Sequence, residues 1–262
     1  MNYLSIHQKM KTLLLLFSLF CLSSCQNTTV TDSKEPLNYK EKIEDHQECV
    51  EGNCATIKLV YPVFEGDTAL SAVVNRQIQE QNFSMWVTGD QEFKGMEDAV
   101  SSFFKDYKRF RTDYPEAPQE WTFETVAKVI HQSDSLISIR FENFSYLGGA
   151  HPNTVVIYLN LDLSENADVL VHEKMLVNRD KLLELAEEKF RQHHEVDPGV
   201  KLEDDGRFFL DEDSFFLPAA MGYEEDEFVL LYNAYEIGPY AMGRTELRFS
   251  LEELEGVVYV PQ

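Results

Sequence analysis

The central part of the chain alternates between apolar and polar residues, which is the pattern of β-strands. A first run covers 57–63, and three more lie within 121–163. The apolar positions are Ile57, Leu59, Tyr61 and Val63; Trp121, Phe123, Ala127 and Val129; Ile137, Ile139 and Phe141; and Val155, Ile157, Leu159, Leu161 and Leu163. Pro62 lacks a backbone N–H, so we expect the first run at a sheet edge. Polar residues such as Tyr158 and Asn160 alternate with the apolar ones, which predicts an antiparallel sheet with one buried and one solvated face.

Apolar residues at three- and four-residue spacing predict three helices. The first follows Asp67 and Thr68, the second spans 93–110, and the third follows Asn178, a good N-cap residue. The aromatic stripe of the second helix is typical of a core-facing helix. Further strands are expected at 228–232, 245–249 and 256–260. These elements predict an α+β fold: an antiparallel sheet with helices packed on one face, in two closely packed sub-domains.

The N-terminus has the pattern of a bacterial lipoprotein signal. Lys9 and Lys11 precede the apolar run 13–22, which is shorter than the about 20 residues that span a bilayer. The run ends in Leu-Ser-Ser-Cys, which resembles a lipobox. We therefore expect cleavage before Cys25, acylation of that cysteine with fatty acids such as palmitate, and anchoring in the cell envelope. The anchored protein would then lie on the periplasmic side or on the surface of the outer membrane, if the organism has an outer membrane. An uncleaved anchor and an ordinary signal peptide are the alternatives.

The expected organisation is a signal peptide (1–24), a lipidated flexible tether (25–47), an α+β module (48–144) and a C-terminal module (145–262). The tether is expected because 26–47 are polar with few apolar anchors. The whole chain has a net charge of −23, and removal of the signal's two lysines gives −25. An acidic surface repels nucleic acid and attracts basic partners. The same negative charge can equally keep the protein soluble or adapt it to a salty habitat.

Cys49 and Cys54 are the cysteines left after Cys21 leaves with the signal and Cys25 is acylated. In an oxidising compartment a pair this close predicts a disulfide around the intervening Gly-Asn turn. Half of a zinc site is the alternative, but a second cysteine or histidine pair at zinc spacing is missing from the sequence.

The segment 146–152, Tyr-Leu-Gly-Gly-Ala-His-Pro, is the most distinctive motif. It separates two expected strands, where paired glycines allow backbone angles closed to other residues. His151 is either a ligand or base on an exposed turn, or a structural residue that caps backbone groups; we favour the structural role. His172 and Glu173 begin like a zinc-protease motif, but Leu176 stands where the second histidine should be. No catalytic residue, metal or cofactor is therefore assigned.

Two motifs carry a family resemblance. Gly148-Gly149-Ala150-His151-Pro152, followed by an alternating strand, and the run 232–243 resemble an uncharacterised envelope domain family. This family occurs in the extracellular region of the lysozyme-sensing anti-sigma factor RsiV and in the N-terminal region of the peptidoglycan deacetylase PdaC. Residues 55–144 look like the module that precedes it there. The resemblance implies binding roles for Gly148, Gly149, His151, Pro152, Tyr235 and Tyr240, and carries no catalytic role over.

Three functions are compatible with these features. The first is an envelope-anchored, non-catalytic binding module for peptidoglycan or a basic protein such as lysozyme. The second is an envelope hydrolase or esterase that uses His151, and the third is a structural lipoprotein of an envelope assembly. A flat acidic face with exposed aromatics would favour the first, and a deep pocket around His151 the second. Tyr146, Tyr235 and Tyr240 are candidate anchors, but we expect each in the core.

Replacing Cys25 with serine tests the lipobox. The Cys25→Ser variant should no longer incorporate a fatty-acid analogue and should leave the membrane fraction, because stable anchoring depends on the buried methylenes of two or more acyl chains. Metabolic labelling and fractionation of wild type and variant measure both effects. Unchanged labelling of the serine variant would contradict the assignment.

Overall fold

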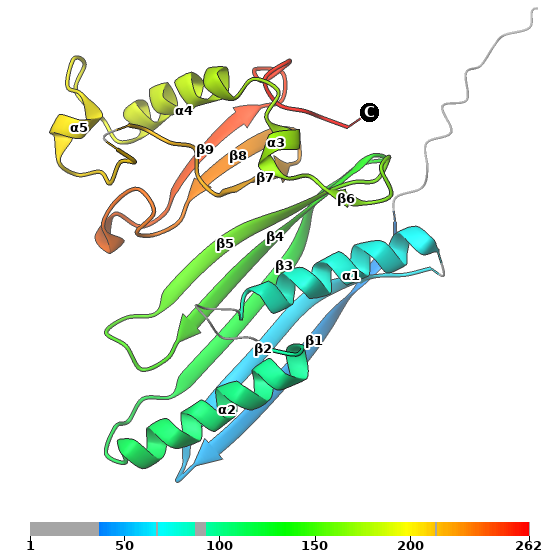
Figure 1. Ribbon diagram of the computed structural model, residues 1–262, viewed down its shortest axis with the longest axis vertical. Helices are drawn as coiled ribbons and strands as arrows, with labels where there is room; N and C mark the ends of the chain where they lie inside the picture. Colours follow the sequence, from blue (N-terminus) through cyan, green and yellow to red (C-terminus); the bar gives the residue numbers. More distant parts are fainter. Residues whose placement is uncertain (1–36, 67, 87–92, 213, 262) are drawn as a thin grey trace, which may run out of the picture. The chain divides into compact units, whose positions relative to one another are not determined.

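The computed structural model describes residues 37–66, 68–86, 93–212 and 214–261. Its larger sheet has the strand order β1-β2-β3-β4-β5-β6 (Figure 1). The strands are β1 (Tyr39–Val50), β2 (Asn53–Phe64), β3 (Trp121–Gln132), β4 (Leu136–Tyr146), β5 (Asn153–Asp162) and β6 (Asp168–Val169). Strands β2 to β5 contain the four alternating runs predicted from the sequence, except Leu163, which directly follows β5.

Helices α1 (Ala69–Ser84) and α2 (Met96–Asp113) cover one face of this sheet (Figure 1). The Thr68 side chain caps α1 by accepting a hydrogen bond from the backbone N–H of Ser71. Helix α2 begins three residues after Phe93, which lies outside it. The alternating strand residues and both helices form the first core, whose most buried members include Ile57, Leu59, Ile78, Tyr107, Ile139 and Phe141. The α+β class and the helices on one face are confirmed.

The strand pairing differs from the expected antiparallel sheet at one place. Strands β2 and β3 pair in parallel over 55–60 and 121–126, because α1 and α2 carry the chain back between them. Strand β2 is also an interior strand, so the edge position expected from Pro62 is wrong. Pro62 lies beyond the stretch that pairs with β3, opposite Glu41 of β1, and therefore interrupts no pairing with β3.

The expected tether was wrong for residues 39–47, which belong to β1. This strand pairs along its whole length with β2 and forms the edge of the sheet. Most of its side chains are exposed, with Ile43 at 54%. An exposed edge strand has no need of the alternating apolar residues that reveal buried strands, so its composition is that of a linker. Residues 25–36 lie outside the described ranges.

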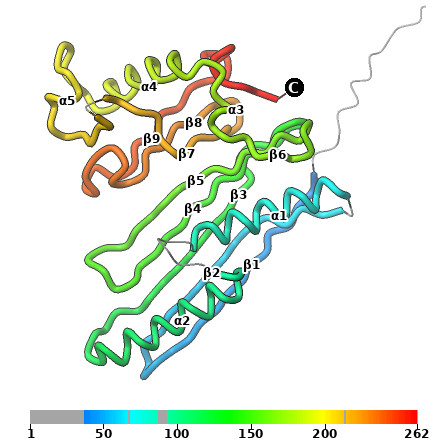
Figure 2. Tube along the Cα trace, viewed as in Figure 1, coloured from blue at the N-terminus to red at the C-terminus, as the bar shows by residue number. Residues whose placement is uncertain are grey.

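The C-terminal part is a second sheet with its own core. Helix α4 (Arg179–His193) lies over β7 (Ala220–Glu224), β8 (Glu227–Tyr232) and β9 (Thr245–Ser250) (Figure 2). The side chain of Asn178 accepts from the N–H of Lys181, which confirms the expected N-cap. Shorter helices complete this part: α3 (His172–Met175), α5 (Leu202–Asp205) and the 3-10 helix η1 (Tyr240–Met242).

Residues 256–260 do not form the strand expected from their apolar run. Turns occupy 251–257, and Val258 makes a single bridge to Leu176. The run is apolar because Val257 and Val258 are buried in the second core. Strand β7, which sequence patterning missed, supplies the third strand instead.

The face of β4 and β5 expected to meet water is largely covered by β7. Asn160 is 3% exposed and Ser138 is fully buried. The Ser138 hydroxyl donates to Asn160 Oδ1 at 2.7 Å, and Asn160 Nδ2 donates to the Met221 carbonyl at 3.0 Å. These polar side chains therefore face a second sheet instead of solvent.

The expected module boundary at 144/145 falls inside the first sheet. Strands β5 and β6 extend that sheet to Val169, so the first module is longer than its alternating runs suggested. The described residues form one compact unit with two sheets, in agreement with closely packed sub-domains. Within the described residues, no helix is long and apolar enough to cross a bilayer.

The contact between the two sheets depends on a glycine and an asparagine. We call this contact, made by β5 with β7 and Asn233, the joint. A Cβ on Gly222 of β7 would lie 2.4 Å from the ring of Tyr158 on β5, so only glycine lets the ring approach. The Tyr158 hydroxyl donates to Glu224, and burial raises its pKa well above the ordinary value, so the hydroxyl stays protonated. Asn233 accepts from the N–H of Val156 at 2.7 Å and donates to its carbonyl at 2.9 Å.

Substitution of Gly222 tests this joint. Gly222→Ala should lower the free energy of unfolding by about 1–3 kcal/mol, although alanine normally suits a strand better, because its methyl group overlaps the Tyr158 ring. Urea denaturation measures the effect. Gly149→Ala is the matched control: its Cβ would meet nothing closer than 3.9 Å, and stability should stay within about 0.5 kcal/mol. Equal stability of both variants would argue against tight packing at the joint.

Candidate functional site

The two sequence motifs meet in space. His151, in the β4–β5 connection, has its Nε2 atom 3.1 Å from the Tyr235 hydroxyl. Its ring stacks on Tyr240, with ring centroids 3.9 Å apart and an interplanar angle of 21°. The Tyr240 hydroxyl donates to the Pro152 carbonyl at 3.2 Å. We call His151, Tyr235 and Tyr240 the His151 cluster.

Backbone geometry positions the cluster from both sides. Gly148 has φ +80°, and a Cβ there would lie 3.3 Å from Trp121 Nε1. A side chain at Gly148 would therefore strain the backbone and crowd the indole. On the other side Tyr235 has φ 71°, in the left-handed region, two residues after the Asn233 that binds the Val156 backbone. The joint between the sheets thus sets the register of the two motif segments.

The cluster is exposed, contrary to the expectation that its tyrosines lie in the core. Tyr235 is 52% exposed and Tyr240 is 37% exposed, while Tyr146 is half-buried. His151 is exposed as well. Exposed aromatic rings that are held by neighbouring contacts are unusual on a surface whose only task is solubility.

Both ring nitrogens of His151 are engaged. Nδ1 is 2.9 Å from the Pro152 carbonyl, which can only accept, so Nδ1 carries a proton. In the neutral ring Nε2 then accepts from the Tyr235 hydroxyl. In the usual catalytic pair a histidine base is also bonded on both nitrogens, to the nucleophile and to a group, commonly a carboxylate, that orients the ring and stabilises its charged form. Here the orienting group is the neutral carbonyl of Pro152. The contacts of His151 within the described residues fit a residue that links two loops better than a base.

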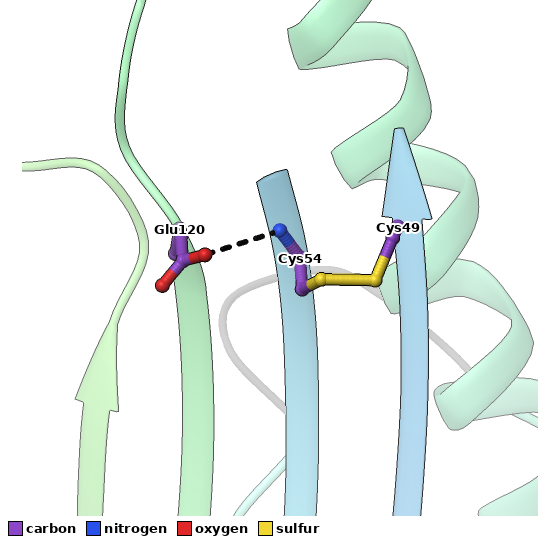
Figure 3. The surroundings of a disulfide bond; sticks show 3 residues. All are labelled: Cys49, Cys54 and Glu120. Atoms are coloured by element: carbon purple, nitrogen blue, oxygen red, sulfur yellow. Dashed lines mark hydrogen bonds between the residues drawn. A yellow bond between two sulfur atoms is a disulfide. The ribbon is translucent and has the colours of Figure 1, made fainter. Parts of the chain in front are cut away.

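Figure 3 shows the Cys49–Cys54 disulfide. The strand register places it at the end of the sheet where β4 reaches the β4–β5 connection. These cysteines are directly opposite each other in the β1–β2 hairpin, where Glu51 and Gly52 form the turn with positive φ angles. The Cys54 N–H donates to Glu120 Oε1 at 3.4 Å, which connects the hairpin to the segment before β3. Cys25, the expected lipid attachment site, lies outside the described residues.

A cavity of about 700 Å³ lies beside the β4–β5 connection, among α1, α2 and strands β3 to β5. Trp86, Phe93, Phe103, Trp121 and Phe123 line it, together with short polar side chains. We call it the aromatic cavity. Sequence reasoning missed it because an aromatic stripe on a helix has the same spacing whether its rings fill a core or line a cavity. Within the described ranges, no group of three or more His, Cys, Asp or Glu residues could hold a metal ion.

A double-mutant cycle tests the bond inside the His151 cluster. His151→Ala and Tyr235→Phe should each lower the free energy of unfolding, and the pair should be coupled by about 0.5–1.5 kcal/mol, because each change alone removes the same hydrogen bond. Thermal and urea denaturation measure the three variants. Strictly additive effects would show that the two side chains do not hold each other.

Comparisons with known proteins agree with this two-part organisation. Residues 48–154 match the family described as "Deacetylase PdaC", and residues 168–252 match that described as "Protein of unknown function (DUF3298)". No curated protein matches the sequence. A DUF3298 family protein from Pseudomonas aeruginosa PAO1 is 22% identical with a TM-score of 0.60, over 86% of this chain and 95% of that chain. A DUF3298 family member from Bacteroides fragilis NCTC 9343 is 21% identical with a TM-score of 0.63, over 86% of this chain and 94% of that chain.

These matches confirm the family resemblance and refine where it lies. The Gly-Gly-Ala-His-Pro motif falls within the PdaC match and the 232–243 motif within the DUF3298 match, so the His151 cluster joins residues from both segments. At these identities the two solved structures show a shared fold. The chain thus combines a segment similar to the PdaC family with a segment similar to the DUF3298 family.

Proposed function

We propose that this chain is a non-catalytic binding module of the cell envelope, anchored through Cys25, that recognises a basic envelope-active protein such as lysozyme. The observation that carries the proposal is the His151 cluster, in which two exposed tyrosines are held in place by a histidine. Tyrosine is enriched among the few residues that supply most of the binding energy at protein interfaces.

The contacts within the cluster prepare it for binding. His151 stacks on Tyr240 and bonds to Tyr235, so the rings lose less conformational freedom when a partner arrives. Preorganisation of this kind raises affinity without adding contacts. A catalytic use of His151 is less well supported, because a neutral carbonyl and not a carboxylate orients its ring.

The charge of the chain indicates the sign of the partner. With −23 on 262 residues, the protein attracts cationic proteins and repels anionic surfaces. Such steering acts over about 8 Å at physiological ionic strength and mainly raises the association rate. The desolvated centre of the interface must therefore supply the remaining affinity, and Tyr235 and Tyr240 are suited to it.

The matched families support an envelope role. The first is described as a deacetylase named PdaC, and the family that the two motifs resemble occurs in a lysozyme sensor. Both are envelope settings, in which a lipid-anchored acidic module would meet cationic enzymes that attack the cell wall.

Calorimetry with lysozyme at low and moderate salt tests the proposal on the detergent-solubilised protein. Saturable binding should weaken with salt yet survive, and Tyr235→Ser should lower the affinity at least about tenfold, as expected for a central anchor. Tyr39→Ser is the matched control, because Tyr39 is 44% exposed at the opposite end of the six-stranded sheet.

The proposal would be contradicted by absent binding at both salt concentrations, by binding that vanishes at moderate salt, or by equal losses in the two tyrosine variants. Absent lysozyme binding would leave peptidoglycan as the next candidate ligand and a structural lipoprotein as the alternative.

A further inference from the structure

Helix α1 carries two asparagines on one side, and they differ in their hydrogen bonds. Asn75 accepts from the backbone N–H of Phe64 at 2.8 Å and donates to the carbonyl of the same residue at 2.9 Å. Asn82 lies two turns further along the helix, so both side chains point toward the sheet. Within the described residues, neither Nδ2 nor Oδ1 of Asn82 has a hydrogen-bonding partner.

The free amide of Asn82 is buried where the sheet cannot satisfy it. The residue is 2% exposed, and an unpaired amide at such a site is destabilising. At Leu59 the backbone of β2 is already paired with β1 on one side and β3 on the other. Phe64 can bind Asn75 because it ends β2, beyond the stretch that pairs with β3. A water or a ligand must therefore complete the hydrogen bonds of Asn82.

Asn82 lines a cavity of about 230 Å³ between α1, the start of α2 and strands β1 and β2. We call it the Asn82 cavity. Leu59 and Met96 form its apolar wall, and its other polar residues are Lys42, Glu44, Tyr61 and Gln79. A water molecule occupies about 30 Å³ in the liquid, so the cavity has room for a small ligand in place of several waters.

The charged residues of the Asn82 cavity are paired with each other. Lys42 Nζ lies 2.7 Å from Glu44 Oε1, and the Tyr61 hydroxyl donates to the same oxygen at 2.5 Å. A charged ligand would have to break this network. The neutral amide of Asn82, in contrast, offers a free donor and a free acceptor side by side. The lining therefore favours a neutral ligand that carries an acceptor and a donor at matching positions.

This fold uses asparagine amides in one recurring way. Asn75 binds both backbone groups of Phe64, and Asn233 binds both backbone groups of Val156. In each case Oδ1 accepts from the N–H and Nδ2 donates to the carbonyl of one strand residue. The same two atoms are free on Asn82, so a residue of an extended peptide is a ligand of matching chemistry.

We infer that the Asn82 cavity binds one residue of a short, extended peptide supplied from outside the chain. The N–H and carbonyl of that residue pair with Asn82, and its apolar side chain packs on Leu59 and Met96. The inference goes beyond the proposed function and does not rest on it, because neither Tyr235 nor Tyr240 lines this cavity.

Two isomeric probes test the backbone contact. N-acetyl-L-leucine N-methylamide keeps the leucine N–H, whereas N-acetyl-N-methyl-L-leucinamide carries the same methyl group on that nitrogen and lacks the donor. The first probe should shift the side-chain amide NMR resonances of Asn82 saturably in the isotopically labelled, detergent-solubilised protein. The second should bind at least about tenfold more weakly, because Oδ1 of Asn82 would stay unpaired in a buried site.

Two variants on α1 provide the matched pair. Asn82→Leu assigns the resonances by their disappearance and should bind the first probe at least about tenfold more weakly. It should resist urea at least as well as wild type, because it removes an unpaired buried amide. Gln77→Leu, on the same helix but outside the cavity lining, should bind as wild type. The backbone amide resonance of Met96 reports binding in both variants.

The inference would be overturned by equal binding of the two isomers or by equal losses in the two variants. Unchanged Asn82 resonances at millimolar probe would mean that only ordered water fills the cavity. Asn82 resonances that move when residues 26–33 are deleted, without any probe, would show that this chain fills the cavity itself, which also contradicts the inference. The two probes are compared on the wild-type protein, so the test holds even if a variant fails to fold. Tyr235→Ser should keep its peptide affinity, so loss of lysozyme binding and loss of peptide binding are distinguishable.

Discussion

The arrangement of this protein depends on the close approach of β7 to the second face of β5. Gly222 permits it, because any side chain there would overlap the ring of Tyr158. Asn233 then satisfies both backbone groups of Val156, as a neighbouring strand would. The polar residues Ser138 and Asn160 can be buried at this joint because each finds a hydrogen-bonding partner, and an unpaired group there would be destabilising.

The His151 cluster is a consequence of this joint. Its residues come from segments more than 80 positions apart, and neither segment can form it alone. Once Asn233 holds the backbone beside Val156, the loop that follows β8 must pass the β4–β5 connection, where His151 meets Tyr235 and Tyr240. The segments that match two different families therefore build one surface between them. This makes the joint, and not either module, the unit on which the proposed binding function rests.

Charge and aromatic surface have separate roles in this picture. The net charge of −23 favours encounter with cationic proteins but distinguishes poorly among them. The cluster and the aromatic cavity instead present aromatic rings that neighbouring side chains hold in place. Both lie at the end of the six-stranded sheet where the Cys49–Cys54 disulfide cross-links β1 to β2.

The sequence alone determined the elements whose side chains are buried on one face: strands β2 to β5 and β8 to β9, helices α1, α2 and α4, and the caps at Thr68 and Asn178. Hydrophobic periodicity is a local signal, and these elements obey it. Periodicity could not reveal β1, whose exposed side chains have the composition of a linker, or the parallel pairing of β2 with β3, which depends on where the helices return the chain.

The sequence motifs also identified Gly148, His151, Tyr235 and Tyr240 as notable residues, without showing which of them are in contact. Only the tertiary structure brought them together, because contacts between distant segments are set by the packing of one sheet on another, and that packing leaves no periodic trace in either segment.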